Sequence, residues 1–368
     1  MSSTNTRPTK HRSPPIENIV LSGGGILGIC YAGVFQFMEE LGIRSGIRRI
    51  LGVSIGSIFG FLFTLKIPAE HIHRLVEQLG ADDIKDIETD NILQFFQYYG
   101  IDTGVKIERF VKACAKVKLG NPDATFADLY NHHPDMEFIV MGAEVTKSER
   151  IYFSYKTTPN YPIWKAIRIS CSIPLYFRPI IDNGKIYVDG AVVCNYPIDY
   201  FREDIENTLG FTFDEYVIEE EKQETTDISA GTDTTASVDF YKYFSHVFET
   251  MLYSFERYMV SQYSDYTVYI RVPKRGLYDY SLQSDTKQKY YDAGYSDMKK
   301  KWNERCKKYG IDNINDSDED DHHNNIEQPS VSDATDSSNN SNTTEEDDIH
   351  SITESLRASH GDHRKRND

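Results

Sequence analysis

The chain has 368 residues, of which 39% are hydrophobic and 12% aromatic, enough for one large domain or two ordinary ones with a packed core. The formal net charge is −17, and residues 311–368 contribute most of it, with 16 Asp and Glu against 4 Lys and Arg. The rest of the chain is only mildly acidic and has no clustered basic face, which argues against nucleic acid as a partner.

The cysteines and the N-terminal segment indicate the cellular compartment in which the protein is expected. The five cysteines are odd in number and show no C-x-x-C spacing. Residues 1–15 are polar and proline-bearing, lack the apolar stretch of a secretory signal, and are interpreted as a disordered tail. Both features favour a reducing compartment, so we expect a cytoplasmic protein.

The first elements alternate between strand and helix. Residues 16–21 form a short apolar run typical of a strand, and residues 29–41 have helical spacing that stops at Gly42. A second apolar run, 47–53, predicts another strand, after which the pattern turns helical through Leu65.

The remaining pattern continues the alternation. Residues 70–120 are expected to be mostly helical. Later segments predict five strands, at 136–145, 150–155, 185–190, 208–213 and 266–273, and two helices, at 239–263 and 285–310. This order predicts an α/β fold with a mainly parallel central sheet and helices on both faces.

Two segments rich in apolar residues have two possible interpretations. The helix 239–263 carries an apolar stripe, interpreted as packing on the core rather than touching a membrane. The same choice arises at 91–101, "NILQFFQYYGI", where core packing is preferred and a lid or membrane-touching segment is the alternative. The predicted organisation is one domain over 16–310 with a polar insertion at about 219–238, followed by an acidic disordered tail, 311–368.

The stretch "GGGILG", residues 23–28, matches G-x-G-x-x-G between a predicted strand and a helix. A dinucleotide site would need an acidic residue about twenty positions on, to hold a ribose hydroxyl. None occurs between Glu40 and Glu70, which argues against a nucleotide cofactor. The glycines can instead supply backbone N–H groups to an oxyanion, with Gly24 and Gly25 as the best donors and Gly23 shaping the turn.

The segment around Ser54 also matches G-x-S-x-G, the pattern of a strained turn that presents a nucleophilic serine. The alternative is a membrane helix with glycines four apart at Gly52, Gly56 and Gly60. The apolar run 50–67 is short for a span and ends near Lys66. A buried strand and helix explain it better, so a transmembrane span is not expected.

A serine nucleophile needs a base to accept its proton. The order Ser54, Asp189, His246 would suit an α/β-hydrolase. His246, however, lies inside the predicted helix 239–263, where a packing or solvated role is the simpler interpretation. Asp189 ends a predicted strand and is followed by Gly190, so its carboxylate can approach another loop closely, although Asp-Gly is also an ordinary turn signal.

With these motifs in order, the sequence resembles the patatin-like phospholipase family. The resemblance rests on "GGGILG" at 23–28, "GVSIG" at 52–56 and "DGA" at 189–191, with further matching text at "TFADL", "AIRISCSIPLYFRPI" and "NYPID". Its motif glycines outside the oxyanion loop are Gly28, Gly52, Gly56 and Gly190. Leu27 departs from the pattern, since many relatives have Arg or Lys in this part of the loop.

The resemblance implies a patatin-like three-layer fold and a Ser–Asp dyad, with Ser54 as nucleophile, Asp189 as base and Gly23–Gly25 as the oxyanion hole. It implies hydrolysis of lipid acyl esters, with no cofactor or metal and with transient contact to a membrane or lipid aggregate. The alternatives are a non-catalytic lipid-binding or scaffold protein with the same fold and a soluble esterase of small substrates. An aspartate base predicts that hydrolysis persists below pH 6, where a neutral histidine would be lost.

Overall fold

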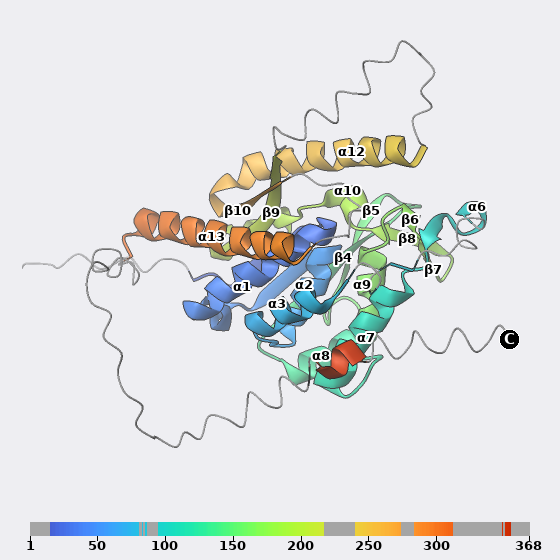
Figure 1. Ribbon diagram of the computed structural model, residues 1–368, viewed down its shortest axis with the longest axis horizontal. Coiled ribbons are helices and arrows are strands. Elements are labelled where there is room, and N and C mark those ends of the chain that lie inside the picture. The colour runs from blue at the N-terminus through green and yellow to red at the C-terminus, as the bar shows by residue number, and fades with distance from the viewer. Residues whose placement is uncertain are drawn as a thin grey trace, which may run out of the picture.

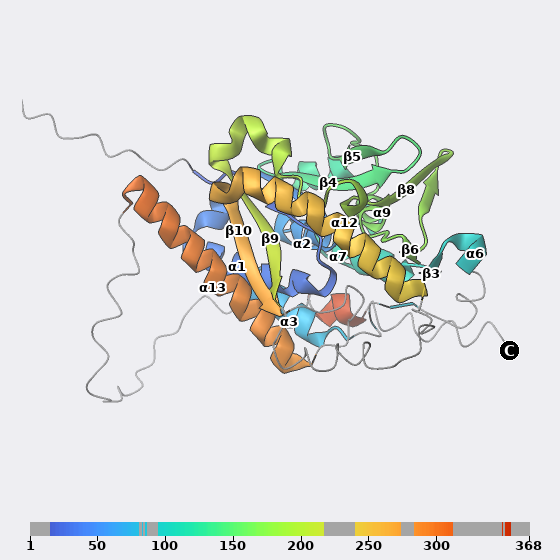
Figure 2. The same ribbon diagram turned by 90° about the horizontal axis from the view of Figure 1, so that it is seen from above.

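The computed structural model describes residues 15–80, 83, 85–86, 95–216, 240–273, 283–311, 348 and 350–354. Helices cover a central sheet; α12 lies along the top of the molecule in Figure 1 and crosses over the sheet in Figure 2. Within these ranges, none of the helices combines the length and hydropathy that a membrane span requires.

The eight-stranded sheet has the order β10-β9-β1-β2-β4-β8-β7, with β5 also paired to β4. The strands from β10 to β4 are parallel to their neighbours, whereas β5, β7 and β8 join antiparallel. Two further strands, β3 and β6, form a separate parallel pair. The bounds are β1 Asn18–Leu21, β2 Arg49–Val53, β3 Gly100–Asp102, β4 Glu137–Glu144, β5 Glu149–Phe153, β6 Leu175–Phe177, β7 Ile180–Asp182, β8 Lys185–Asp189, β9 Thr208–Tyr216 and β10 Thr267–Pro273.

The two faces of the sheet build two cores of unequal size. Along β1, Ile19 and Leu21 pack into the larger core and Val20 into the smaller one, as alternation along a strand requires. The elements with residues in the larger core are η1 Gly25–Ile29, α1 Cys30–Glu40, α2 Ile55–Thr64, α3 Ala69–Gln78, α7 Val105–Leu119, α8 Phe126–His132, α9 Ile163–Ser170 and α13 Ser284–Tyr309. The smaller core packs against α10 Ala191–Cys194, η3 Ile198–Asn207 and α12 Phe240–Tyr263. The short elements η2 Ile43–Gly46, α6 Phe95–Tyr98 and η6 Ser264–Tyr266 complete the order.

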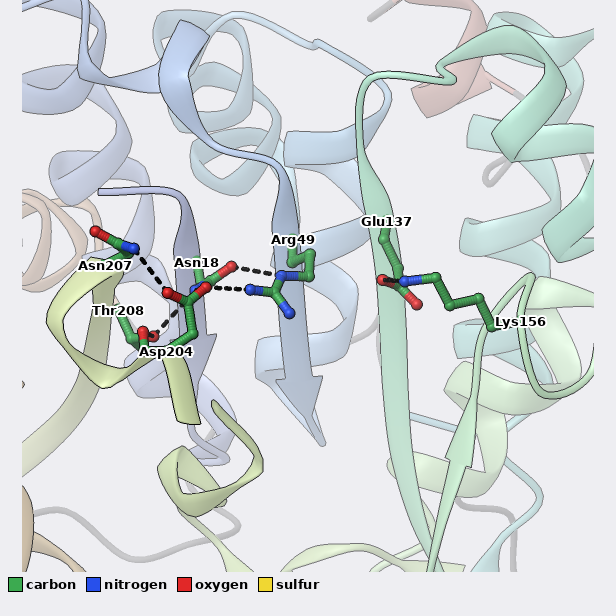
Figure 3. A network of polar contacts seen from close by, with 7 residues as sticks. All are labelled: Asn18, Arg49, Glu137, Lys156, Asp204, Asn207 and Thr208. Atoms are coloured by element: carbon green, nitrogen blue, oxygen red, sulfur yellow. Dashed lines mark hydrogen bonds and ion pairs between the residues drawn. The ribbon is translucent and has the colours of Figure 1, made fainter. Parts of the chain in front are cut away.

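Polar contacts fix the amino ends of the central strands (Figure 3). Asn18, at the start of β1, donates to Asp204 at 2.9 Å and accepts from Arg49, at the start of β2, at 2.7 Å. Arg49 also forms an ion pair with Asp204. Glu137, at the start of β4, pairs with Lys156 at 2.6 Å. These contacts hold the amino-terminal ends of β1, β2 and β4 in place. The loops that follow β1 and β2 lie at the opposite, carboxyl-terminal ends of the strands.

Most of the predicted elements are confirmed, and the predicted α/β class is correct. One difference lies within 70–120, where Gly100–Asp102 forms a strand beside β6 instead of helix. A second lies in the acidic tail, where residues 350–354 are helical, Ile352 is buried and Asp348 pairs with Lys118 at 2.9 Å. The predicted N-terminal tail, apart from Pro15, and the insertion at 219–238 lie outside the described residues. The five cysteines are all among the described residues; each is buried and none forms a disulfide.

The prediction that the apolar residues of 239–263 and 91–101 pack on the core is wrong in part. On α12, Phe248 and Met259 are buried, but Val247, Met251 and Phe255 are exposed. The helix rests on the sheet by one side only, so the remaining apolar residues face outward. In the segment 91–101, Phe96, Tyr98 and Tyr99 are exposed as well.

Candidate active site

Ser54 occupies a tight turn between β2 and α2. Its backbone has φ 51° and ψ −126°, a conformation that non-glycine residues adopt only under strain. The turn is possible because its flanking positions are glycines: a Cβ on Gly52 would lie 2.4 Å from the Gly56 carbonyl oxygen, and one on Gly56 would lie 2.3 Å from the Leu21 oxygen. The G-x-S-x-G pattern therefore marks a strand-to-helix turn in this fold.

Hydrogen bonds hold the Ser54 backbone from both sides. Its N–H donates to Ser170 Oγ at 2.9 Å, and Ser170 Oγ donates onward to the Met141 carbonyl at 2.6 Å. The Ser54 carbonyl accepts from Ser57 Oγ at 2.6 Å. The residue is 6% exposed, so its side chain sits in a fixed, mostly dry position.

Asp189 reaches Ser54 across strand β4. Register pairs Val53 with Met141 on one side of β4 and Asp189 with Gly142 on the other. Ser54 and Asp189 therefore lie at the same level on either side of β4, and both line the hollow beneath α12. The Ser54 hydroxyl lowers the pKa of Asp189, as expected for a polar group close to the carboxylate.

The environment of Asp189 raises its proton affinity. The side chain is fully buried, and this desolvation raises its pKa from 3.8 to about 7. Three groups partly offset the effect by stabilising the carboxylate: the Ala191 N–H, which donates to Oδ1 at 2.8 Å, the Ser54 hydroxyl and the Arg168 guanidinium. Among the described residues Oδ2 accepts no hydrogen bond at standard geometry, so it can take a proton without losing one. A carboxyl group with a pKa near 7 is mostly protonated below pH 6 and cannot then act as a base. The expectation that hydrolysis persists below pH 6 therefore no longer follows.

The glycine loop lies directly beside the serine, because β1 and β2 are parallel neighbours with Leu21 paired to Gly52. A Cβ on Gly23 would lie 3.0 Å from Ser54 Cβ and 2.5 Å from Asn195 Oδ1. Gly25 has φ 55°, in the left-handed region that glycine tolerates.

The backbone N–H groups of the glycine loop remain available to a ligand. Within the described part of the chain, those of Gly23, Gly24 and Gly25 donate to no protein acceptor. The loop is held instead through a carbonyl: Asn195 Nδ2 donates to the Gly23 oxygen at 3.3 Å and to Glu256 at 2.8 Å. The remaining motif glycines allow close packing, since a Cβ on Gly28 would lie 2.3 Å from Ile55 and one on Gly190 2.6 Å from the Met141 oxygen.

A buried arginine orders the strand that carries Asp189. Arg168 donates to Ser172 Oγ at 2.7 Å and to the Thr103 and Arg178 carbonyls at 2.8 and 3.0 Å. Ser172 in turn accepts the Asp189 N–H at 2.9 Å through its carbonyl. The sequence reasoning assigned no role to Arg168, Ser170 or Asn195. They lie in the quoted stretches "AIRISCSIPLYFRPI" and "NYPID", but nothing in their spacing shows what they contact.

Two hollows meet at Ser54. The first is almost wholly apolar, runs between α2, α3 and α7, and is lined by Ile29, Ile58, Leu62, Leu75, Ile107 and Phe110 among others. The second lies beneath α12, contains Asp189 and the glycine loop, and is polar through Asn195, Glu249 and Glu256. The first has the shape and chemistry to hold a hydrocarbon chain, and the second surrounds the reacting groups.

The histidine alternative finds no support in this geometry. His246 is exposed on the outward side of α12. Among the described residues, no histidine lines either hollow at Ser54. Asp189 is the carboxylate whose pKa the Ser54 hydroxyl affects.

Comparison with known proteins identifies the family and the fold. The family model described as "Patatin-like phospholipase" matches residues 19–202. The chain is 27% identical to "Uncharacterized protein R571" of Acanthamoeba polyphaga mimivirus, over 57% of this chain and 69% of that one. It is 28% identical to "Probable lipid hydrolase 463L" of Invertebrate iridescent virus 6, over 50% of this chain and 62% of that one. Among solved structures, VipD from Legionella pneumophila shares the fold, with a TM-score of 0.53 and 17% identity over 79% of this chain and 67% of VipD.

Proposed function

This chain belongs to the patatin-like phospholipase family, and we propose that it hydrolyses fatty-acyl esters of lipids through an acyl-enzyme formed on Ser54. The observation that carries the proposal is the meeting of three features at one point. Ser54 on a strained turn, the buried carboxylate of Asp189 and the open N–H groups of the glycine loop line one hollow. Ser54 and Gly25 also line the neighbouring apolar hollow.

The first half of the reaction forms the acyl-enzyme. Asp189 takes the proton from Ser54 Oγ as that oxygen attacks the ester carbonyl carbon. The carbonyl π electrons move to its oxygen, and the N–H groups of Gly24 and Gly25 stabilise the resulting negative charge. The intermediate then expels the alcohol, which takes the proton back from Asp189.

The second half releases the fatty acid. Asp189 removes a proton from water, the resulting hydroxide adds to the acyl carbon, and Ser54 leaves with that proton. A pKa near 7 suits this role, because the carboxylate is then both present at neutral pH and basic enough to accept a proton. The apolar hollow would hold the acyl chain throughout both steps.

Release of free fatty acid from mixed phospholipid vesicles tests the proposal. Ser54→Ala and Asp189→Asn should each lose at least about a hundredfold in rate, and His246→Ala should keep the wild-type rate on a dispersed short-chain ester. Circular dichroism confirms that each variant is folded. An Asp189→Asn enzyme with near-full activity would refute the dyad. Wild-type protein that binds lipid but releases no fatty acid from phospholipids, acylglycerols or simple esters would establish a non-catalytic lipid-binding protein instead.

A further inference from the structure

The outward side of α12 carries a row of exposed apolar and aromatic side chains. Tyr243, Val247, Met251, Phe255 and Tyr258 are 60, 39, 62, 40 and 59% exposed. Their spacing of four, four, four and three residues confines them to an arc of about 120° on the helix. We call these five residues the α12 stripe. It is a continuous surface feature rather than scattered apolar residues.

The opposite side of α12 belongs to the active site. Phe248, Glu249, Leu252 and Glu256 line the polar hollow that contains Ser54. The two glutamates are 7 and 6% exposed. The same helix therefore borders the reacting groups with one face and presents the stripe with the other. Figure 2 shows the helix lying across the sheet.

Charge on α12 is divided in the same way. The acidic residues between Phe240 and Tyr263, Glu249 and Glu256, both point inward. Among the described side chains, the exposed ionisable groups of the helix that can be positive are His246 and Arg257. Asp214 of β9, whose side chain is 54% exposed, lines a hollow with Arg257, but in a chain with a net charge of −17 the described part of α12 itself exposes no carboxylate. This face of α12 is complementary to lipid phosphates, and tyrosines toward both ends of the stripe suit the boundary between hydrocarbon and head groups.

From these observations we infer that the α12 stripe docks the protein on a phospholipid surface, with the helix lying in the plane of the interface. The inference rests on the proposed function, since it supplies the surface from which an acyl chain enters the hollow at Ser54. Docking through this helix places the polar hollow directly beneath the lipid surface. The short helix α6, which carries Phe96 with 87% exposure, lies beyond the N-terminal end of α12 in both views (Figures 1 and 2).

The test is a matched pair of charge substitutions in the full chain. Met251→Glu introduces a carboxylate into the stripe, and Ile181→Glu introduces one on β7, where the exposure of 65% is similar to the 62% of Met251. Binding is measured by co-sedimentation with phosphatidylcholine vesicles, with and without phosphatidylserine. Hydrolysis of a dispersed short-chain ester is measured in parallel, because neither residue lines a hollow at Ser54.

We expect Met251→Glu to weaken vesicle binding at least about tenfold and Ile181→Glu to change it less than about twofold. Both variants should hydrolyse the dispersed ester at the wild-type rate. Equal vesicle binding by wild type and Met251→Glu overturns the inference. So does a wild-type dimer, detected by sedimentation velocity, that Met251→Glu dissociates, since the stripe would then be a protein interface. The two proposals can also be separated. If the wild-type protein binds vesicles but hydrolyses no ester, and Met251→Glu loses that binding, the docking surface is supported and only the catalytic proposal is refuted.

Discussion

Replacing Asp189 by asparagine should abolish activity and yet stabilise the folded protein above neutral pH. Asparagine keeps the shape of the side chain and an oxygen that can accept the Ala191 N–H. It carries no charge, so it removes the cost of burying a carboxylate. The stabilisation should depend on pH in a manner set by the raised pKa of Asp189.

The sign and size follow from proton linkage. Below the ordinary pKa of 3.8 the carboxyl group is protonated in both folded and unfolded chains and contributes no pH dependence. Between 3.8 and about 7 the unfolded chain releases this proton while the folded protein keeps it. The free energy of unfolding of the wild type therefore falls by about 1.4 kcal/mol per pH unit in this window, to a total of about 4 kcal/mol.

Urea denaturation of wild type and Asp189→Asn at two pH values measures this difference. About pH 5.5 and about pH 8 are suitable, and roughly 2 kcal/mol of the total should accumulate between them. Subtracting the wild-type value from the variant value at each pH removes the contribution of all other titrating groups. The extra stability of Asp189→Asn should thus be about 2 kcal/mol larger at the higher pH.

A stability difference that is the same at both pH values would refute the reasoning. It would mean that Asp189 titrates in the folded protein near its ordinary pKa, and that the site is wetter or better compensated than its burial indicates. A difference that grows toward low pH would imply a lowered pKa, and with it a carboxylate too weakly basic for the proposed role.

Three further outcomes are expected. The kcat/KM for a neutral dispersed ester should rise with pH through an apparent pKa near 7 as Asp189 becomes the carboxylate, so full activity at pH 5 would contradict the assignment. Ser54→Gly and Ser54→Ala should both be inactive, but Ser54→Gly should be more stable by about 1 kcal/mol in thermal unfolding, because glycine adopts φ 51° without strain. Gly23→Ala should lower kcat/KM at least about a hundredfold, since its Cβ would lie 2.5 Å from Asn195 Oδ1. The control Gly46→Ala, whose Cβ would be 3.5 Å from the Ile16 oxygen, should keep wild-type activity.

The sequence predicts the frame of the site because local chemistry determines it. Glycines on either side of Ser54 are needed for a turn of this tightness, and short apolar strands lead into both the glycine loop and the nucleophile turn. The same logic places Asp189 at a strand end. What the sequence does not provide is the strand order. Only the pairing of β4 with β2 on one side and β8 on the other brings Asp189 level with Ser54.

Supporting residues are harder to predict, because their partners are distant in the chain. Arg168 reaches Thr103 and Arg178, and Asn195 joins the Gly23 carbonyl to Glu256. A buried arginine and a surface arginine have the same sequence signature when they lie on a short amphipathic helix. Their roles follow from the tertiary packing alone.

The orientation of α12 shows the same limit and explains the stripe. Helical spacing identifies residues that share a side of the helix, but α12 has apolar residues on two sides, and spacing does not say which side faces the core. Polar contacts settle the choice: Glu256 accepts hydrogen bonds from Asn195 and Thr212 in the interior. Burying a carboxylate is costly unless hydrogen bonds compensate it, and these partners provide that compensation. The side of α12 that carries Glu249 and Glu256 can therefore face the interior. Met251 and Phe255 are then necessarily left on the outside. The hydrogen bond between Asn195 and Glu256, which supports the glycine loop, thus also determines which apolar residues of α12 face outward, toward the proposed lipid surface.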